Sequence, residues 1–209
     1  MGYGYYNYYP KAAARPKPKP GKNRKKFGET WWGAQWVEVI STAGDEQRMS
    51  RGRAYARAEM VKNFKIMGGK ISAKVQGNSG VYSITISFTK HKERDWQNII
   101  EKLKSTPIVL GTLLNNEMPE NLAEITGCSF IPKEFDADCS CPDYANPCKH
   151  IAAVFYMLAD EIDHDPFLLL ELCGMKKDKL LELVSGTEKK KTKRKKTPKK
   201  KIRKRGKHE

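Results

Sequence analysis

Three cysteines and one histidine lie within twelve consecutive positions of this chain, and this cluster constrains the fold more than any other feature of the sequence. The four residues are Cys139, Cys141, Cys148 and His150. Thiolate sulfur and imidazole nitrogen are ligands that Zn²⁺ prefers, and four of them complete its tetrahedral coordination. The spacing therefore predicts one zinc ion that fixes the local path of the chain.

The spacing within each pair also predicts the local backbone. Residues two apart on an extended strand face the same side, so Cys139 and Cys141 can bind one ion from the edge of a hairpin. In a regular helix, residues two apart point roughly 200° away from each other, so Cys148 and His150 cannot both lie inside a helix. We expect Cys148 at or just before a helix start and His150 in the first turn, because Pro147 prevents the helix from extending backwards.

Four protein ligands leave no coordination position for an activated water, so the predicted zinc site is structural. The free energy of metal binding should then stabilise the last third of the fold. Three other interpretations stay open: a packed cluster of reduced thiols, a nucleophile and base pair of Cys148 and His150, or disulfides. The free ring N–H of His150 is expected to donate to Asp138, to Asp143 or to a backbone carbonyl.

Charge is distributed very unevenly along the chain. Of a net +16 over 209 residues, residues 1–26 carry +8 and residues 189–209 carry +13, while residues 27–188 carry −5. Within this middle part, residues 27–90 carry +4 and residues 91–188 carry −9. Affinity for a polyanion is therefore expected first in the two terminal segments and second in residues 27–90.

The two terminal segments have compositions that do not support a folded core. Residues 1–26 combine five tyrosines with a run of alternating basic residues and prolines, which favours extended polyproline geometry. Residues 187–209 are rich in lysine, and their like charges repel one another. We predict two basic arms that are disordered or are ordered only by a partner.

Between the arms, hydrophobic periodicity predicts an α+β fold. The helical spacing of Trp32, Trp36 and Ile40 indicates a helix that ends near Gly44 and turns its aromatic side chains into the core. From residue 60 to residue 88, alternating apolar residues and two glycine-containing turns predict a three-stranded antiparallel meander. We then expect helices at 93–103, 107–115 and 119–125, an extended stretch around Phe135, and helices at 149–162, 167–173 and 177–184.

Composition and pattern divide the chain into five segments. Residues 27–90 are a helix with an antiparallel sheet, residues 91–127 a helical linker region, and residues 128–186 the zinc finger with C-terminal helices, while arms at 1–26 and 187–209 flank them. Cys128 and Cys173 stand in apolar contexts and are expected in the core. Apolar runs fall far short of the roughly 18 residues that a membrane helix needs, and no secretory signal is evident. We expect a cytoplasmic protein in a reducing compartment with no membrane partner.

The four predicted zinc ligands match the signature of the SWIM zinc-finger family, which is C-x-C, a variable gap and then C-x-H. The chain therefore resembles this family. The likeness extends over about residues 3–186. It includes the tyrosine-rich opening and the elements Trp32-Gly-Ala-Gln-Trp36 and Arg51-Gly-Arg-Ala-Tyr55-Ala-Arg57, as in short prokaryotic members. The resemblance implies a zinc-dependent module that binds DNA or protein, often encoded beside a Swi/Snf-type helicase ATPase.

Basic and aromatic residues also gather before the predicted meander. Arg48, Arg51, Arg53 and Arg57 lie within ten residues around Tyr55. Guanidinium groups bind phosphate bidentately, and a tyrosine ring can stack on a base. An alternative is that these arginines pair with carboxylates of the acidic half of the same chain. The candidate nucleic-acid-binding residues in the arms are Tyr5, Tyr6, Lys22, Arg24, Lys25, Lys26, Lys193, Arg194, Lys195, Lys196, Lys199, Lys200, Lys201, Arg203, Lys204 and Arg205.

These features favour a non-enzymatic zinc-finger protein that binds DNA or RNA with little sequence specificity, because phosphate contacts carry no base information. Its acidic zinc half is expected to dock a protein, and no small-molecule substrate is expected. The alternative is a structural protein of a ribonucleoprotein such as the ribosome, which binds rRNA through the basic arms. An enzyme is not expected, since the sequence has no glycine-rich phosphate loop with a lysine and no paired acid and base residues.

Overall fold

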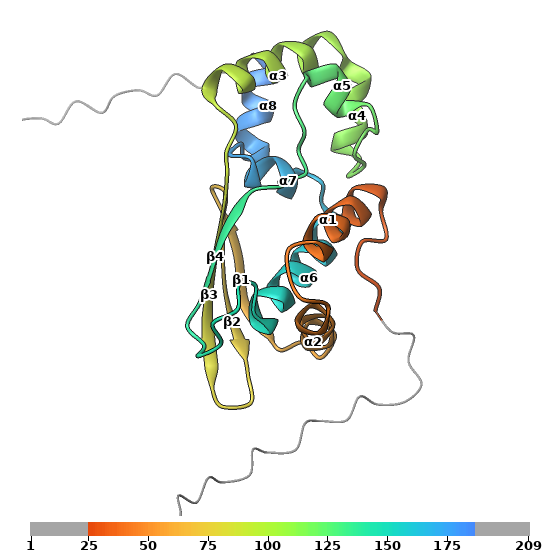
Figure 1. Ribbon diagram of the computed structural model, residues 1–209. Coiled ribbons are helices and arrows are strands. Elements are labelled where there is room, and N and C mark those ends of the chain that lie inside the picture. The colour runs from red at the N-terminus through yellow and green to blue at the C-terminus, as the bar shows by residue number, and fades with distance from the viewer. Residues whose placement is uncertain (1–24, 187–209) are drawn as a thin grey trace, which may run out of the picture.

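The computed structural model describes residues 25–186, whose arrangement Figure 1 shows. Apart from Lys25 and Lys26, the two predicted arms lie outside the described residues. The predictions for the tyrosines and basic residues of these arms, and for their disorder, therefore fall outside this range.

Two N-terminal helices begin at side chains that cap them. Helix α1 (Trp31–Ser41) follows Thr30, whose hydroxyl accepts a hydrogen bond from the amide of Gly33. Helix α2 (Glu46–Arg57) follows Asp45, whose carboxylate accepts from the amide of Arg48. The first of these is the predicted helix before Gly44. The second carries the arginine cluster, to which the sequence pattern assigns no element.

Strands β1 (Val61–Met67), β2 (Lys70–Gln76) and β3 (Val81–Phe88) pair antiparallel in chain order and confirm the meander. The turn between β1 and β2 contains Gly68 and Gly69, whose φ values of 58° and 79° favour glycine. The extended stretch around Phe135 is strand β4 (Phe135–Cys139), which pairs antiparallel with β3. The sheet has the order β1-β2-β3-β4, so β4 adds a fourth strand from a distant part of the chain.

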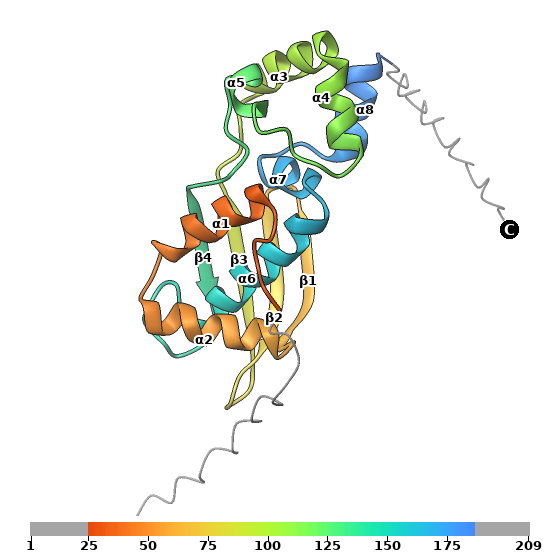
Figure 2. The ribbon, with the colours of Figure 1, turned by 90° about the vertical axis from the view of Figure 1, so that its right-hand side faces the viewer.

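Helix α6 (Lys149–His164) lies on one face of the sheet together with α1 and α2 (Figures 1 and 2). The layers meet around Trp36, which is fully buried. Its ring centroid lies between 5.8 and 6.3 Å from those of Phe88, Phe135 and Phe155, and all three contacts are edge-on. Trp32 is buried as well, which confirms the predicted core role of this helix face.

Shorter helices complete the described residues. They are α3 (Glu93–Ser105), α4 (Pro107–Leu114), α5 (Leu122–Thr126), α7 (Phe167–Leu172) and α8 (Lys177–Ser185). Each matches a predicted helix, although α5 begins later than residue 119 because residues 120 and 121 form a turn. Helices α3 and α8 pack together beyond one end of the sheet (Figures 1 and 2).

The two isolated cysteines contribute to the core of this part. Cys173 is buried, and Cys128 is half-buried and packs against the same cluster of apolar side chains. Between residues 25 and 186, none of the helices combines the length and the hydropathy needed to span a bilayer.

Candidate metal centre

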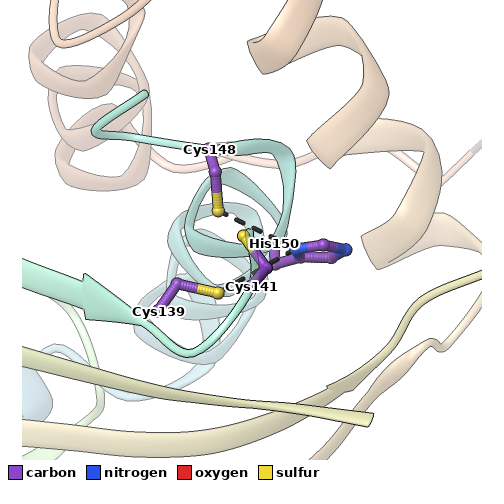
Figure 3. Close-up of side chains that lie close together, drawn as sticks. All are labelled: Cys139, Cys141, Cys148 and His150. Carbon is purple, nitrogen blue, oxygen red and sulfur yellow. Dashed lines mark hydrogen bonds between the residues drawn. The ribbon is translucent and has the colours of Figure 1, made fainter. Parts of the chain in front are cut away.

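Four side chains converge where β4 ends and α6 begins (Figure 3). One ligand atom from each of Cys139, Cys141, Cys148 and His150 lies within 4.8 Å of the other three. His150 Nδ1 is 3.9 Å from Cys139 Sγ and 3.8 Å from Cys148 Sγ. Zinc bonds of about 2.3 Å to sulfur and about 2.1 Å to nitrogen would place such a pair about 3.6 Å apart in a tetrahedron. The ligand atoms therefore already lie near the corners of a zinc tetrahedron.

Strand β4 positions the first pair of cysteines. Cys139 is its last residue and pairs with Ile84 of β3. Just beyond the strand, the amide of Ser140 donates to the carbonyl of Ser83 (3.1 Å), and the amide of Ser83 donates to the hydroxyl of Ser140 (3.0 Å). These bonds fix the chain between Cys139 and Cys141 against the neighbouring strand.

The start of α6 positions the second pair. Cys148 is the N-cap residue with extended backbone angles (φ −77°, ψ 171°), and its side chain makes no capping hydrogen bond. Burial raises the pKa of this thiol, but the backbone amides of Ile151 and His150 act on the sulfur to lower it, so the amino-terminal end of the helix favours a thiolate there. His150 follows in the first turn, and both residues are buried. The spacing of the two residues predicts this arrangement, in which Cys148 has an extended backbone and His150 lies inside the helix.

Two tyrosines and a glycine enclose the imidazole of His150. The ring centroids of Tyr82 and Tyr55 lie 4.6 Å and 5.7 Å from that of the imidazole. A Cβ atom on Gly77 would lie 3.0 Å from Nε2 of His150 and 2.6 Å from the ring of Tyr82. The hairpin between β2 and β3 can therefore close over the imidazole only because residue 77 has no side chain.

The outer ring nitrogen of His150 corrects one expectation. Nε2 is buried and makes no hydrogen bond with residues 25–186. Asp143 instead accepts from the amide of Ala145 (3.2 Å) and from the guanidinium of Arg48 (3.4 Å). Neither Asp143, Asp138 nor a backbone carbonyl of the described residues accepts from this nitrogen, and the contacts to the imidazole ring come from Tyr82 and Tyr55.

Burial sets the protonation of the cluster. Burial, with a smaller effect of Lys149, lowers the pKa of His150 to about 4, so the imidazole is neutral and has a lone pair for a metal at neutral pH. Burial raises the pKa of the Cys139 and Cys148 thiols, which hold their protons until a cation displaces them. The donor set, its geometry and its burial fit one structural zinc ion.

The arginine cluster lies on α2, beside the loop that carries the metal ligands. Arg48 pairs with Asp143 of this loop at 3.4 Å and lies 4.0 Å from Asp45. The Ala145 amide first, and the hydrogen bond from Arg48 second, lower the pKa of Asp143. Arg48 thus joins α2 to the metal-binding loop, as the alternative of internal ion pairs expects.

Arg53 and Arg57 contact their own chain in other ways. Arg53 donates to the hydroxyl of Tyr156 (2.9 Å), and its guanidinium lies 4.9 Å from the centre of that ring. Arg57 donates to the carbonyl of Lys25 (2.9 Å) and lies 5.9 Å from the ring of Phe27. These contacts join Arg53 and Arg57 to a hydroxyl group, a backbone carbonyl and two aromatic rings of the same chain.

The remaining candidates of the described range differ in their surroundings. Arg51 is exposed on α2. Tyr55 packs on the imidazole of His150, and its hydroxyl donates to Asn78 of the β2–β3 turn (3.2 Å). Lys25 pairs with Asp160 at 2.6 Å, while Lys26 is exposed. Tyr55 therefore belongs to the surroundings of the metal ligands.

Sequence reasoning does not find Asp163, which anchors the first described residues to α6. Its carboxylate accepts from the amides of Gly28 (2.8 Å), Glu29 (2.9 Å) and Thr30 (3.0 Å), and from the hydroxyl of Thr30 (2.6 Å). These bonds hold residues 28–30 against the C-terminal end of α6. An acidic residue near the end of a helix gives no sequence signal for such a role.

Comparisons with known proteins bear on the same centre. The family model for the SWIM zinc finger matches residues 114–159, a range that contains all four ligands. The chain is 36% identical over 186 residues to the uncharacterized protein Rv2102 of Mycobacterium tuberculosis, and the alignment covers 83% of this chain and 67% of that protein. No solved structure gives a significant match.

Proposed function

Because this chain belongs to the SWIM zinc-finger family, we propose that it is a non-enzymatic adaptor that binds nucleic acid around one structural zinc ion. In this proposal the basic arms and the exposed part of α2 contact nucleic acid with little sequence specificity. The acidic part of the chain docks a protein, for which a Swi/Snf-type helicase is the partner class that the resemblance implies. Such a protein would reside with the nucleoid or with ribosomes in the cytoplasm.

The observation that carries the proposal is the completeness of the ligand set. Three thiolates and one imidazole converge within 4.8 Å of one another, so side chains of this chain fill all four positions of a tetrahedral zinc ion. A catalytic zinc keeps a position for water or substrate, and this donor set keeps none. Zinc at this point would supply folding free energy rather than an activated water, so the proposal gives the ion no catalytic role.

Charge supports nucleic acid as the ligand. The two arms hold 22 lysines and arginines, whereas residues 27–188 are net acidic. Lysine-rich segments bind phosphates by releasing counterions, which makes the affinity steeply dependent on salt. If about six to ten of these residues contact phosphate, the affinity should fall about 10³–10⁵-fold between about 50 and about 200 mM salt.

On α2, the contacts within the chain narrow the surface that is available to phosphate. Arg48 and Arg53 have carboxylate and hydroxyl partners, and Arg57 bonds to a backbone carbonyl. Arg51 is exposed on the same helix and remains the strongest candidate of this cluster for a phosphate contact.

The acidic part of the chain supports protein docking. Residues 91–188 carry −9, which repels phosphate. Within this part, α4 exposes two large apolar side chains, with Ile108 83% and Leu114 46% accessible. Exposed apolar side chains in a part of the chain with net negative charge suit a protein contact better than a nucleic-acid contact.

The test compares the full chain with a variant that lacks residues 189–209 and with Arg51→Gln. Binding to duplex DNA, single-stranded DNA and folded RNA is measured across a range of salt. We expect a steep salt dependence for the full chain, a large loss of affinity on deletion and a smaller loss for Arg51→Gln. Preference for folded RNA at moderate salt would favour the ribonucleoprotein alternative, and no binding to any of the three would overturn the proposal.

A further inference from the structure

The four-stranded sheet has one face that none of the described helices covers. Helices α1, α2 and α6 all lie on the opposite face (Figures 1 and 2). Burial alternates strictly along β2, where Ile71, Ala73 and Val75 are buried and the residues between them are exposed. The chemistry of the open face is therefore that of the exposed alternate residues of the four strands.

Four lysines gather on the β1 and β2 side of this open face. They are Lys62, Lys65, Lys70 and Lys74, and all four are exposed. The strand register places Lys62 directly opposite Lys74 and Lys65 opposite Ser72. Like charges directly opposite each other destabilise a sheet. None of the ion pairs in the described part of the chain involves these lysines, so their charge lacks a direct partner there.

Strand β3 continues this face with hydroxyl groups. The register pairs Ser83 with Lys74 and Ser87 with Lys70, and Thr85 lies between them. Lysine and hydroxyl side chains both donate hydrogen bonds to phosphate oxygens. Between the exposed apolar residues Met67 and Val81 at its two ends, the open face thus presents a patch of donors across three strands. We call this patch the lysine–hydroxyl face (Lys62, Lys65, Lys70, Ser72, Lys74, Ser83, Thr85 and Ser87).

We propose that the lysine–hydroxyl face binds the phosphate backbone of a nucleic-acid duplex. This inference rests on the proposed nucleic-acid-binding function and names the part of the folded body that takes part in it. Lys70 and Lys74 are four residues apart on one strand, which is about 13 Å. A duplex carries one charge per about 1.7 Å of axis, so about eight phosphates lie along that length. Phosphates near the facing lysines would offset their mutual repulsion.

The lysine–hydroxyl face contains no aromatic side chain, which favours a duplex over a single strand as its ligand. Proteins that bind single strands stack successive bases on aromatic rings. The aromatic residues of the sheet instead pack against the core on the covered face, namely Phe64, Tyr82, Phe88 and Phe135. The open face therefore offers phosphate contacts without a stacking surface, which suits a nucleic acid whose bases are already paired.

Strand β4 limits the extent of the face. Its exposed residues are Asp136 and Asp138, which pair with Ser87 and Thr85 of β3. Two carboxylates at this edge repel phosphate. The duplex is therefore expected to lie over β1, β2 and β3, with β4 outside the contact.

The test uses the full chain with its four sheet lysines changed together: Lys62→Gln, Lys65→Gln, Lys70→Gln and Lys74→Gln. A matched variant carries Lys102→Gln, Lys104→Gln, Lys176→Gln and Lys179→Gln, all exposed positions in α3 or at α8. Both variants lose four positive charges and keep both arms, so they have the same net charge. Binding to a DNA duplex, an RNA duplex and a DNA single strand is measured between about 50 and about 200 mM salt.

For the duplexes, the slope of log affinity against log salt should decrease by about 0.9 for each lysine that contacts a phosphate. We expect a decrease of about 2 to 4 in the sheet variant and a much smaller one in the matched variant. The comparison of the DNA and RNA duplexes identifies which of them is bound. Asp136→Asn removes a repulsive charge and should tighten duplex binding.

Equal slopes in the two variants would overturn the role of this face, although binding by the arms would survive. A sheet variant that aggregates with an unchanged slope would overturn it too, because the lysines would then only protect the edge strand β1 from pairing. If the chain binds the single strand more tightly than the duplexes, and this binding depends on the same four lysines, then the inference that the face binds a duplex is wrong. Failure of the unmodified chain to bind any nucleic acid would instead refute the proposed function itself. Zinc content and melting temperature are compared in all variants to confirm folding.

Discussion

One glycine-to-alanine substitution should destabilise the protein strongly, although alanine is the better helix former. Gly52 lies in the middle of α2 and is buried against α6. A Cβ atom at this position would lie 2.3 Å from the Cβ of Ala152 and 2.8 Å from the backbone nitrogen of Ala153. Carbon atoms in contact prefer about 3.5–4.0 Å, so the first distance is more than about 1 Å too short. Helices α2 and α6 must therefore move apart to accept Gly52→Ala.

The expected magnitude follows from two opposing terms. Overpacking of a well-packed core costs about 1–3 kcal/mol, and the upper end applies because backbone atoms of α6 cannot rotate away as a side chain does. Replacing a helical glycine by alanine recovers about 1 kcal/mol. We expect a net destabilisation of about 2 kcal/mol, which lowers the melting temperature by about 4–8 °C in a body of this size.

The matched control is the same substitution in α4. A Cβ atom on Gly111 would meet no atom within 4 Å, so Gly111→Ala gains helix propensity without a clash. This variant should be more stable by about 0.5–1 kcal/mol. Urea unfolding of both zinc-loaded variants, with zinc content measured in parallel, provides the comparison. Changes of the same sign in the two variants, or a neutral Gly52→Ala, would refute the inference that α2 and α6 are in backbone contact.

Other predictions concern the metal and the anchors of the chain. Cys148→Ser should release zinc and reduce the helical signal of α6, whereas one retained equivalent of zinc with unchanged melting would contradict a structural ion. Gly77→Ala should press on the imidazole of His150 and weaken zinc retention in a competition with a chelator. Burial lowers the pKa of His150 to about 4 from 6.5, so the unfolded chain takes up this proton first as the pH falls. In metal-free protein, the contribution of His150 to the free energy of unfolding should be fully present above about pH 6.5 and should decrease as the pH falls toward 4. Urea unfolding across this pH range measures it. Asp163→Ala leaves several amides of residues 28–30 unpaired and should cost about 1–3 kcal/mol, with faster proteolysis near this segment.

Local features of the fold could be predicted from the sequence because their cause is local. Two-residue spacing places Cys148 before a helix and His150 inside it, and the structure has this arrangement. The glycine pair at Gly68 and Gly69 marks the first turn of the meander because the positive φ there favours glycine. The ligand set could be predicted too, because the four ligands lie close together in the sequence and their side chains are of the types that zinc binds.

The remaining features depend on contacts between distant segments, which periodicity does not encode. Strand β4 was expected only as an extended stretch, since its pairing with β3 joins residues about 50 apart. Arg53 and Asp163 each contact residues that lie more than 100 positions away in the sequence. The packing of Tyr55 and Tyr82 on His150, where a carboxylate or a backbone carbonyl was expected, could not be predicted because these rings come from α2 and β3, far from the ligands in the chain.

Helix α6 joins two attachment points whose separation its own length determines. Its first turn carries the metal ligand His150, and its last turn carries Asp163, which holds residues 28–30. At about 1.5 Å per residue these points stand about 20 Å apart along one rigid axis. Chelation of the ion would release the loop between the cysteines at one end of this axis, while the carboxylate of Asp163 would still hold residues 28–30 at the other end.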